Sequence, residues 1–217
     1  MLGVQSFTFN PVQENTYVLY EGKDACIIDP GCYFGNERRT LKEWLGDQQL
    51  IPKYLLNTHC HLDHVFGNKF IHDEYGLTLH IHEKERELLH HAPAAALQWN
   101  MPFENYRGDL IFLHAGDKIR IGTSELTVIP APGHSPGSIC FYCKAQDFIV
   151  SGDVLFRLSI GRTDLPGGDH ETLIRSIHNE IFVLPDKTIV YPGHGDPTTV
   201  GYEKKHNPFV GSVKRTN

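Results

Sequence analysis

The sequence predicts an α+β protein in which two β-sheets pack face to face and helices cover the outside. Short runs rich in Val, Ile and Tyr recur along the chain, and each is closed by Gly, Pro, Asn or Asp, as strands bounded by turns are. Helical patterns interrupt these runs irregularly, and the first strands follow one another as hairpin-like pairs. A doubly wound parallel sheet would need regular alternation of strands and helices, so two packed sheets are favoured.

The apolar patterns place each element along the chain. Strands are expected at residues 16–20, 25–28, 54–56, 78–81, 126–129, 139–142, 148–150 and 188–191. Helices are expected at residues 36–45, 64–75, 82–91 and 171–184. The region 92–107 has no strand pattern and is expected to be loop and helix, with His90 and His91 ending the helix before it.

Length and charge limit the class of protein. A chain of 217 residues without a linker or repeat is expected to form a single domain over residues 1–217. The 26 acidic residues exceed the 20 basic ones, and the net charge of −6 offers no general attraction for nucleic acid. The N-terminus lacks the basic start of a signal peptide and no apolar run is long enough to span a bilayer, so no membrane partner is expected.

The five cysteines show no spacing typical of a disulfide framework. Cys140 and Cys143 lie three residues apart in an expected strand, where they face opposite sides, so two separately packed thiols are favoured over a shared metal or redox role. Cys60 is expected to point into the core, away from the residues on either side of it. An odd number of thiols suits a reducing compartment, and a cytoplasmic location is therefore expected.

The densest cluster of reactive side chains follows the expected strand at 54–56. Four potential metal ligands, His59, His61, Asp63 and His64, fall within six residues. In an extended chain His59 and His61 project to the same side, whereas the adjacent Asp63 and His64 must diverge. The spacing predicts two neighbouring ligand sets rather than one ion held by all four residues.

Three further candidates, His134, Asp153 and His194, each follow an expected strand in a glycine-containing turn. If these strand ends gather at one edge, the cluster holds five imidazoles and two carboxylates. Such nitrogen and oxygen ligands suit Zn, Fe, Mn or Co, and two ions about 3.5–4 Å apart need a bridging carboxylate such as Asp153. His194 alone would indicate a polar turn residue, but the compact cluster favours a metal site.

The pattern His-x-His-x-Asp-His, followed by the three isolated ligands, resembles the metallo-β-lactamase fold superfamily from about Phe7 to Phe209. The resemblance implies a four-layer αββα sandwich with two divalent metal ions at one edge, with zinc expected and iron or manganese as alternatives. It implies that His59, His61 and His134 bind the first metal, that Asp63, His64 and His194 bind the second, and that Asp153 bridges them. It also implies that Asp29 supports the metal-binding loop from behind.

Within this superfamily the chain is similar to the glyoxalase II-like branch, because an aspartate rather than a cysteine stands at the bridging position. The segments 159–169 and 193–203 resemble single-domain bacterial members of that branch. Full glyoxalase II enzymes carry a C-terminal helical domain that helps hold glutathione, and that domain is not expected here. They also carry a Lys and a Tyr where this chain has Arg162 and Asp164. Arg162 is placed in the substrate cleft as a carboxylate-binding residue, with a structural ion pair as the alternative.

Together these residues and the resemblance imply a metal-dependent hydrolase acting on a small-molecule thioester. Two metals sharing one water supply a hydroxide and stabilise the tetrahedral oxyanion, and Asp63 is the candidate for holding the released proton. The expected reaction is thioesterase cleavage of a hydroxyacylglutathione such as S-lactoylglutathione to D-lactate and free thiol. The alternatives are a mononuclear-iron persulfide dioxygenase, a lactonase or phosphodiesterase on the same site, and a non-catalytic metal-binding protein. The acyl group, thiol carrier and oligomeric state stay open.

Two histidines outside the cluster, His80 and His82, share one face of an expected strand end. The sequence from His82 to Arg86 departs from the His-Glu-x-x-His of zinc peptidases, because no second histidine follows at the required spacing. This segment is expected to lie on the solvated surface.

Overall fold

The computed structural model of the chain describes residues 1–212 and contains two six-stranded sheets. In spatial order the first sheet consists of β1 (Gly3–Phe9), β2 (Glu14–Glu21), β3 (Asp24–Ile28), β4 (Ile51–Leu56), β5 (Leu79–Ile81) and β6 (Leu110–Phe112). The second consists of β14 (Thr198–Thr199), β13 (Ile189–Pro192), β10 (Phe148–Gly152), β9 (Ile139–Cys143), β8 (Ser124–Pro130) and β7 (Lys118–Ile121). The short strands β11 (Leu155–Phe156) and β12 (Ser159–Ile160) form a separate hairpin.

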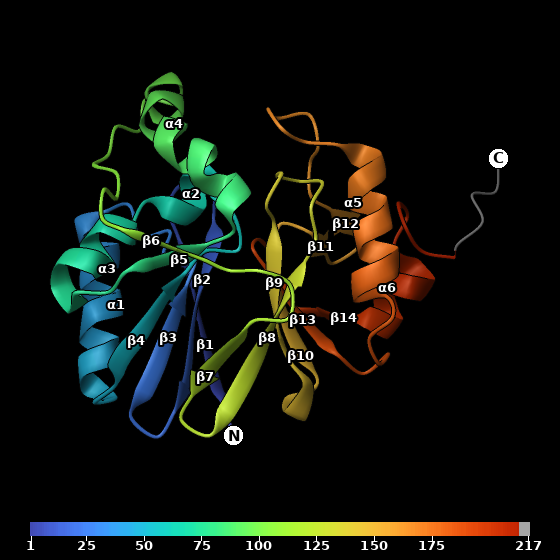
Figure 1. Ribbon diagram of the computed structural model, residues 1–217, viewed down its shortest axis with the longest axis horizontal. Helices are drawn as coiled ribbons and strands as arrows, with labels where there is room; N and C mark the ends of the chain where they lie inside the picture. Colours follow the sequence, from blue (N-terminus) through green and yellow to red (C-terminus); the bar gives the residue numbers. More distant parts are fainter. Residues whose placement is uncertain (213–217) are drawn as a thin grey trace.

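Helices lie on both outer sides of the paired sheets (Figure 1). The helices of the first half are α1 (Gly35–Asp47), α2 (Leu62–Val65), α3 (Asn68–Tyr75) and α4 (Arg86–Gln98), with a 3₁₀ turn at Glu83–Glu85. Those of the second half are α5 (His170–Ser176), which continues as a π-helix over Ile177–Ile181, and α6 (Val200–His206), and a 3₁₀ turn spans Lys144–Gln146. The expected four-layer αββα sandwich is therefore confirmed.

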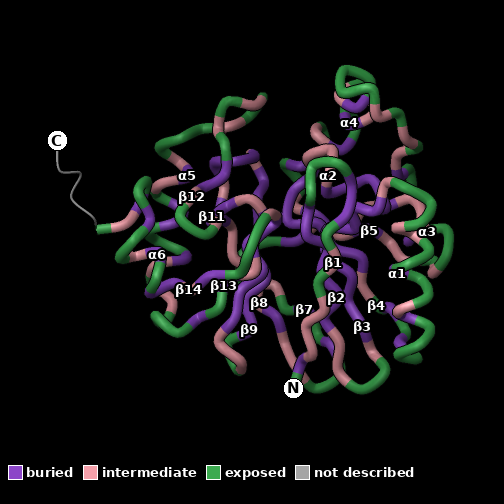
Figure 2. The backbone as a smooth tube through the Cα atoms, turned by 180° about the vertical axis from the view of Figure 1, so that it is seen from behind, coloured by how far each residue is buried: buried purple, intermediate pink, exposed green. Residues whose placement is uncertain are grey.

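Three apolar layers hold the sandwich together. Leu19 of β2 and Phe141 of β9 are buried between the two sheets. Leu41 of α1 packs against the outer face of the first sheet, and Leu173 of α5 packs against the outer face of the second. Figure 2 shows the buried strands at the centre and the exposed outer faces of the helices.

The cysteines lie where the strand pattern predicts. Cys140 faces the layer beneath α5, whereas Cys143 faces the layer between the sheets, so the two thiols point in opposite directions. Cys60 is buried in the apolar layer outside the first sheet, as expected. All five cysteines are free and buried.

The expected helix at 64–75 is wrong as a single element, because it is divided into α2 and α3 at Gly67. In a continuous helix the Gly67 amide would donate to the carbonyl of Asp63. Instead it donates to the carbonyl of Pro30 at 2.7 Å, and the Asp63 carbonyl accepts from the side-chain amide of Asn10 at 3.0 Å. Contacts from elsewhere in the chain thus separate Asp63 and His64 from the helix that follows.

The expected helix end at His90 and His91 is also wrong, because α4 continues past Pro93. Proline lacks an amide hydrogen, which leaves the carbonyl of Leu89 without its helical partner. The side-chain amide of Asn105 donates to that carbonyl at 2.5 Å and replaces the missing bond. A residue of the following loop therefore allows the helix to run through the proline.

The directions of the strands decide where their ends meet. β3 and β4 are parallel, and so are β10 and β13. β8 runs in the same direction as β10, since β9 is antiparallel to both. The segments that follow β3, β4, β8, β10 and β13 consequently meet at one edge of the sandwich, the upper edge in Figure 1. Within residues 1–212, no helix has the length and apolarity needed to cross a membrane.

Candidate metal centre

All seven candidate ligands lie at the edge where these strands end, and six of them form two neighbouring groups. His59, His61 and His134 each offer a ligand atom within 4.8 Å of the others. Asp63, His64 and His194 do the same. The structure thus brings together the two groups that the resemblance implies, from segments that lie between His59 and His194 in the chain.

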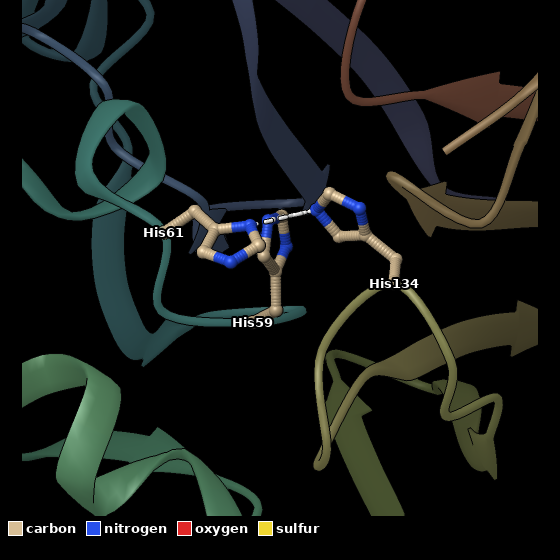
Figure 3. Close-up of side chains that lie close together, drawn as sticks. All are labelled: His59, His61 and His134. Atoms are coloured by element: carbon tan, nitrogen blue, oxygen red, sulfur yellow. Dashed lines mark hydrogen bonds between the residues drawn. The ribbon is translucent and has the colours of Figure 1, made fainter. Parts of the chain in front are cut away.

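In the first group three imidazole nitrogens converge (Figure 3). The Nε2 atoms of His59 and His134 are 3.2 Å apart, and Nδ1 of His61 is 2.7 Å from Nε2 of His134. His59 and His61 come from the loop after β4, and His134 comes from the loop between β8 and β9. Because nitrogens bound to one zinc lie about 2.0–2.1 Å from it, this spacing suits a single ion.

In the second group Nε2 of His194 lies 3.0 Å from Oδ2 of Asp63, and Nε2 of His64 lies 3.5 Å from the same oxygen. Asp153 stands between the two groups. Its Oδ1 is 3.4 Å from Nε2 of His64, and its Oδ2 is 3.5 Å from Nε2 of His134. One carboxylate therefore faces ligands of both groups, as a bridging residue must.

Four of the five imidazoles are held by a contact at Nδ1 that turns Nε2 toward the centre. The partners are Thr58 Oγ1 for His59 at 3.0 Å, Asp29 Oδ2 for His64 at 3.1 Å, the Arg162 carbonyl for His134 at 2.7 Å and the Gln13 carbonyl for His194 at 3.1 Å. Each acceptor assigns a proton to Nδ1. Such contacts from behind are the usual means of orienting histidine ligands.

Asp29 makes the most contacts with the loop that carries the ligands. Its Oδ1 accepts from the amide of Thr58 at 2.7 Å, and its Oδ2 accepts from the Thr58 hydroxyl at 2.6 Å and faces Nδ1 of His64. The residue is buried and has a φ of +50°, which L-residues rarely adopt. These contacts agree with the supporting position that the resemblance implies.

Changing Asp29 to asparagine will weaken metal binding at the second group by roughly 10- to 100-fold, because an amide holds the His64 imidazole less firmly than a carboxylate does. Titration of metal-free protein with Zn²⁺ against a chelating dye measures this change. Asp24→Asn, whose side chain is 43% exposed and lies 4.0 Å from Lys53, is the matched control. Equal affinities for the two variants would contradict a role for Asp29 in orienting His64.

Burial and neighbouring charges set the protonation of the ligands. Burial lowers the pKa of His61 to about 4 and also lowers the pKa of His59 and His134, so these imidazoles are neutral near pH 7 and able to bind metal. Burial alone would lower the pKa of His64, but the carboxylates of Asp63 and Asp153 raise it well above its ordinary value. The second group therefore favours a positive charge, which a proton supplies in the metal-free protein and a cation would replace.

Two buried atoms at the centre show directly that the residues fit a cation. Nε2 of His64 and Oδ1 of Asp153 have no hydrogen-bond partner among the described residues, although they are only 3.4 Å apart. Leaving buried polar atoms unpaired is costly, and a divalent cation would satisfy both. A donor set of imidazole nitrogens and carboxylate oxygens suits zinc, iron or manganese.

Gly193 has a role that the sequence did not reveal. A Cβ atom at this position would lie 2.1 Å from Oδ1 of Asp153, so only glycine allows the end of β13 to pass this carboxylate. The motif at 192–195 is thus needed for space as well as for His194.

Two buried glutamates next to the cluster were also missed. Glu14 accepts from the Thr16 hydroxyl at 2.9 Å, and its other oxygen lies 3.9 Å from Nδ1 of His64. Glu85 belongs to the segment expected on the solvated surface, and this expectation is wrong for Glu85, which is fully buried. The residues next to Glu85 in the sequence are charged, so local composition does not predict its burial. Its hydrogen bonds to Cys60, Ser135 and Gly137 explain that burial.

Arg162 contributes to the site through its backbone. Its side chain is 55% exposed and forms two hydrogen bonds of 2.7 Å with Asp164, the ion pair considered as the alternative. Its carbonyl orients His134. The structure therefore gives this residue a positioning contact and leaves its guanidinium at the surface.

Comparison with known proteins agrees with this geometry. Residues 9–194 match the metallo-beta-lactamase superfamily. The hydroxyacylglutathione hydrolase GloC of Haemophilus influenzae is 34% identical, and the alignment covers 97% of this chain and 99% of GloC. The crystal structure of the BLEG-1 B3 metallo-beta-lactamase is 40% identical with a TM-score of 0.88, covering 96% of this chain and 99% of that one.

A second solved structure, TTHA1623 in a di-iron-bound form, is 36% identical with a TM-score of 0.86, and the match covers 94% of this chain and 99% of that one. The match to the family extends over most of the sequence and includes the segments that carry all seven clustered residues. The chain therefore belongs to the metallo-beta-lactamase superfamily and is a homologue of hydrolases within it.

Proposed function

We propose that this protein is a two-metal thioesterase that hydrolyses hydroxyacylglutathione substrates, with S-lactoylglutathione as the reference compound. The observation that carries the proposal is the Asp153 carboxylate, which lies 3.4–3.6 Å from imidazoles of both ligand groups. The relationship to GloC supports the thioester substrate.

The residues divide the chemistry between them. Two divalent cations, when bound, lower the pKa of a water and polarise the acyl oxygen. His59, His61 and His134 would hold one cation, and Asp63, His64 and His194 would hold the other, with the Asp153 carboxylate facing both groups. Because the first group offers three neutral imidazoles and the second includes the Asp63 carboxylate, a cation in the first group would be the more electrophilic one and would suit the acyl oxygen.

Asp63 is the proposed proton acceptor. Its Oδ2 faces Nε2 of His194 at 3.0 Å. Burial acts to raise the pKa of Asp63, but the charge of His64 and the contact with His194 together hold that pKa below the ordinary value. A carboxylate that is ionised and fixed at the edge of the centre can take the proton that the attacking water releases.

The proposed setting is the cytoplasm, with small molecules as the only substrates. All five cysteines are unpaired and buried, which suits a reducing compartment. The net charge of −6 gives no reason to propose a nucleic-acid substrate.

A substrate panel with metal-counted protein tests the proposal. S-lactoylglutathione, a β-lactam such as nitrocefin and a simple lactone are compared by kcat/KM, and oxygen uptake is followed with glutathione persulfide. The β-lactam is included because the 40% identical structure is a B3 metallo-beta-lactamase. We expect the thioester to exceed the other esters and amides at least about 100-fold. Faster β-lactam or lactone hydrolysis, or one iron per chain with oxygen uptake, would overturn the proposed substrate.

A further inference from the structure

Glu85 is a buried carboxylate that belongs to neither ligand group. It lies at the end of the 3₁₀ turn between β5 and α4 and has no exposed surface. Acidic side chains are almost never fully buried unless they are paired. Three hydrogen-bond donors pair this carboxylate, and their positions in the chain indicate its role.

The carboxylate binds two separate loops. Its Oε2 accepts from the backbone amide of Cys60 at 2.8 Å. Its Oε1 accepts from the hydroxyl of Ser135 at 2.7 Å and from the amide of Gly137 at 2.6 Å. Gly137 lets the side chain come this close, because a Cβ there would lie 2.9 Å from Cγ of Glu85.

These two loops are the ones that carry the first ligand group. Cys60 stands between His59 and His61 on the loop after β4, and Ser135 follows His134 on the loop between β8 and β9. The loops belong to different sheets. Among the described residues, Glu85 makes no hydrogen bond to the second ligand group or to the residues that orient it.

We infer that Glu85 is a positioning residue that fixes the distance between the His59 and His61 turn and the His134 turn, and so preorganises the first ligand group for its cation. This inference rests on the proposed two-metal centre. A carboxylate is required because all three partners are donors, and a glutamine would direct its own N–H groups at one of the loops.

The experiment compares Glu85→Gln with Glu87→Gln, which makes the same change at a position that is 79% exposed. Metal-free protein is titrated with Zn²⁺ while the ring signals of the individual histidines are followed by NMR. We expect Glu85→Gln to weaken binding at His59, His61 and His134 by at least about tenfold and to leave His64 and His194 within about threefold of wild type. The control will match wild type at both groups.

Amide hydrogen exchange in the metal-free protein provides a second readout that does not depend on the metal chemistry. Cys60 and Gly137 should exchange faster in Glu85→Gln than in the control. Ser135→Ala, which removes one donor and keeps the carboxylate, should shift both readouts in the same direction by a smaller amount. Unchanged exchange at the two amides, or equal weakening of both ligand groups, would overturn the inference. If wild type binds no metal while exchange responds as expected, the proposed function fails and the loop contact stands.

Discussion

Replacing Asp153 with alanine will lower kcat/KM for S-lactoylglutathione at least about a thousand-fold. Its carboxylate is the group that faces ligands of both sets. Burial acts to raise its pKa, but His64, together with His134 and His194, holds that pKa below the ordinary value. Losing several kcal/mol of electrostatic stabilisation in the transition state corresponds to this factor, since each 1.36 kcal/mol changes a rate about tenfold. Steady-state kinetics with counted metal will measure the effect.

Asp47→Ala removes a carboxylate from the exposed end of α1 and serves as the control. It should keep the wild-type rate. If Asp153→Ala retained a rate within about tenfold of wild type with the same metal content, a bridging role for this residue would be wrong.

Removing metal with a chelator will abolish hydrolysis and lower the melting temperature. The buried centre places Asp63 and Asp153 near one another, where the imidazoles of His64 and His194 partly balance their charge, and a divalent cation there stabilises the folded state further. A ligand present at a hundred times its Kd adds about 2.7 kcal/mol, which corresponds to roughly 5–10 °C for a protein of this size. Calorimetry and activity assays on the same samples will measure both changes.

Adding Zn²⁺, Mn²⁺ or Fe²⁺ back to the chelated protein will reverse both effects and will identify the metal that supports the fastest turnover. Full activity in protein shown to be free of metal would refute the metal-dependent mechanism.

The fold could be predicted well from the sequence where local patterns decide it. The strands that lead into the site, including β4 and β8, contain short, mainly apolar stretches closed by turn residues, and the structure confirms them. The edge strand β1 and the short strand β14 lack such runs and were missed. Their pairing is fixed by neighbours in the sheet rather than by their own composition.

The candidate ligands could be found because their chemistry is concentrated in short motifs. The close spacing of four ligands identifies the first motif, which holds His59, His61, Asp63 and His64. The other three ligands follow strands that end at the same edge. The supporting contacts could not be found in this way. His194 is oriented by the backbone carbonyl of Gln13, which lies 181 residues away in the sequence. A pattern of side chains cannot predict a contact made by a backbone atom.

Glu85 illustrates the same difficulty for a side chain. Its sequence neighbours are charged and exposed, so local composition predicts a surface position. Its burial follows from donors on two distant loops, the nearer of which is 25 residues away. Substrate choice is equally hard to predict, since the Arg162 side chain points to Asp164 and the residue acts on His134 through its carbonyl.

Anomalous X-ray diffraction at the absorption edge of the metal in the purified protein tests the central claim most directly. A two-metal centre predicts two peaks about 3.5–4 Å apart, one among His59, His61 and His134 and one among Asp63, His64 and His194, with Asp153 between them. A single peak in one group, or metal bound only outside these seven residues, would contradict it.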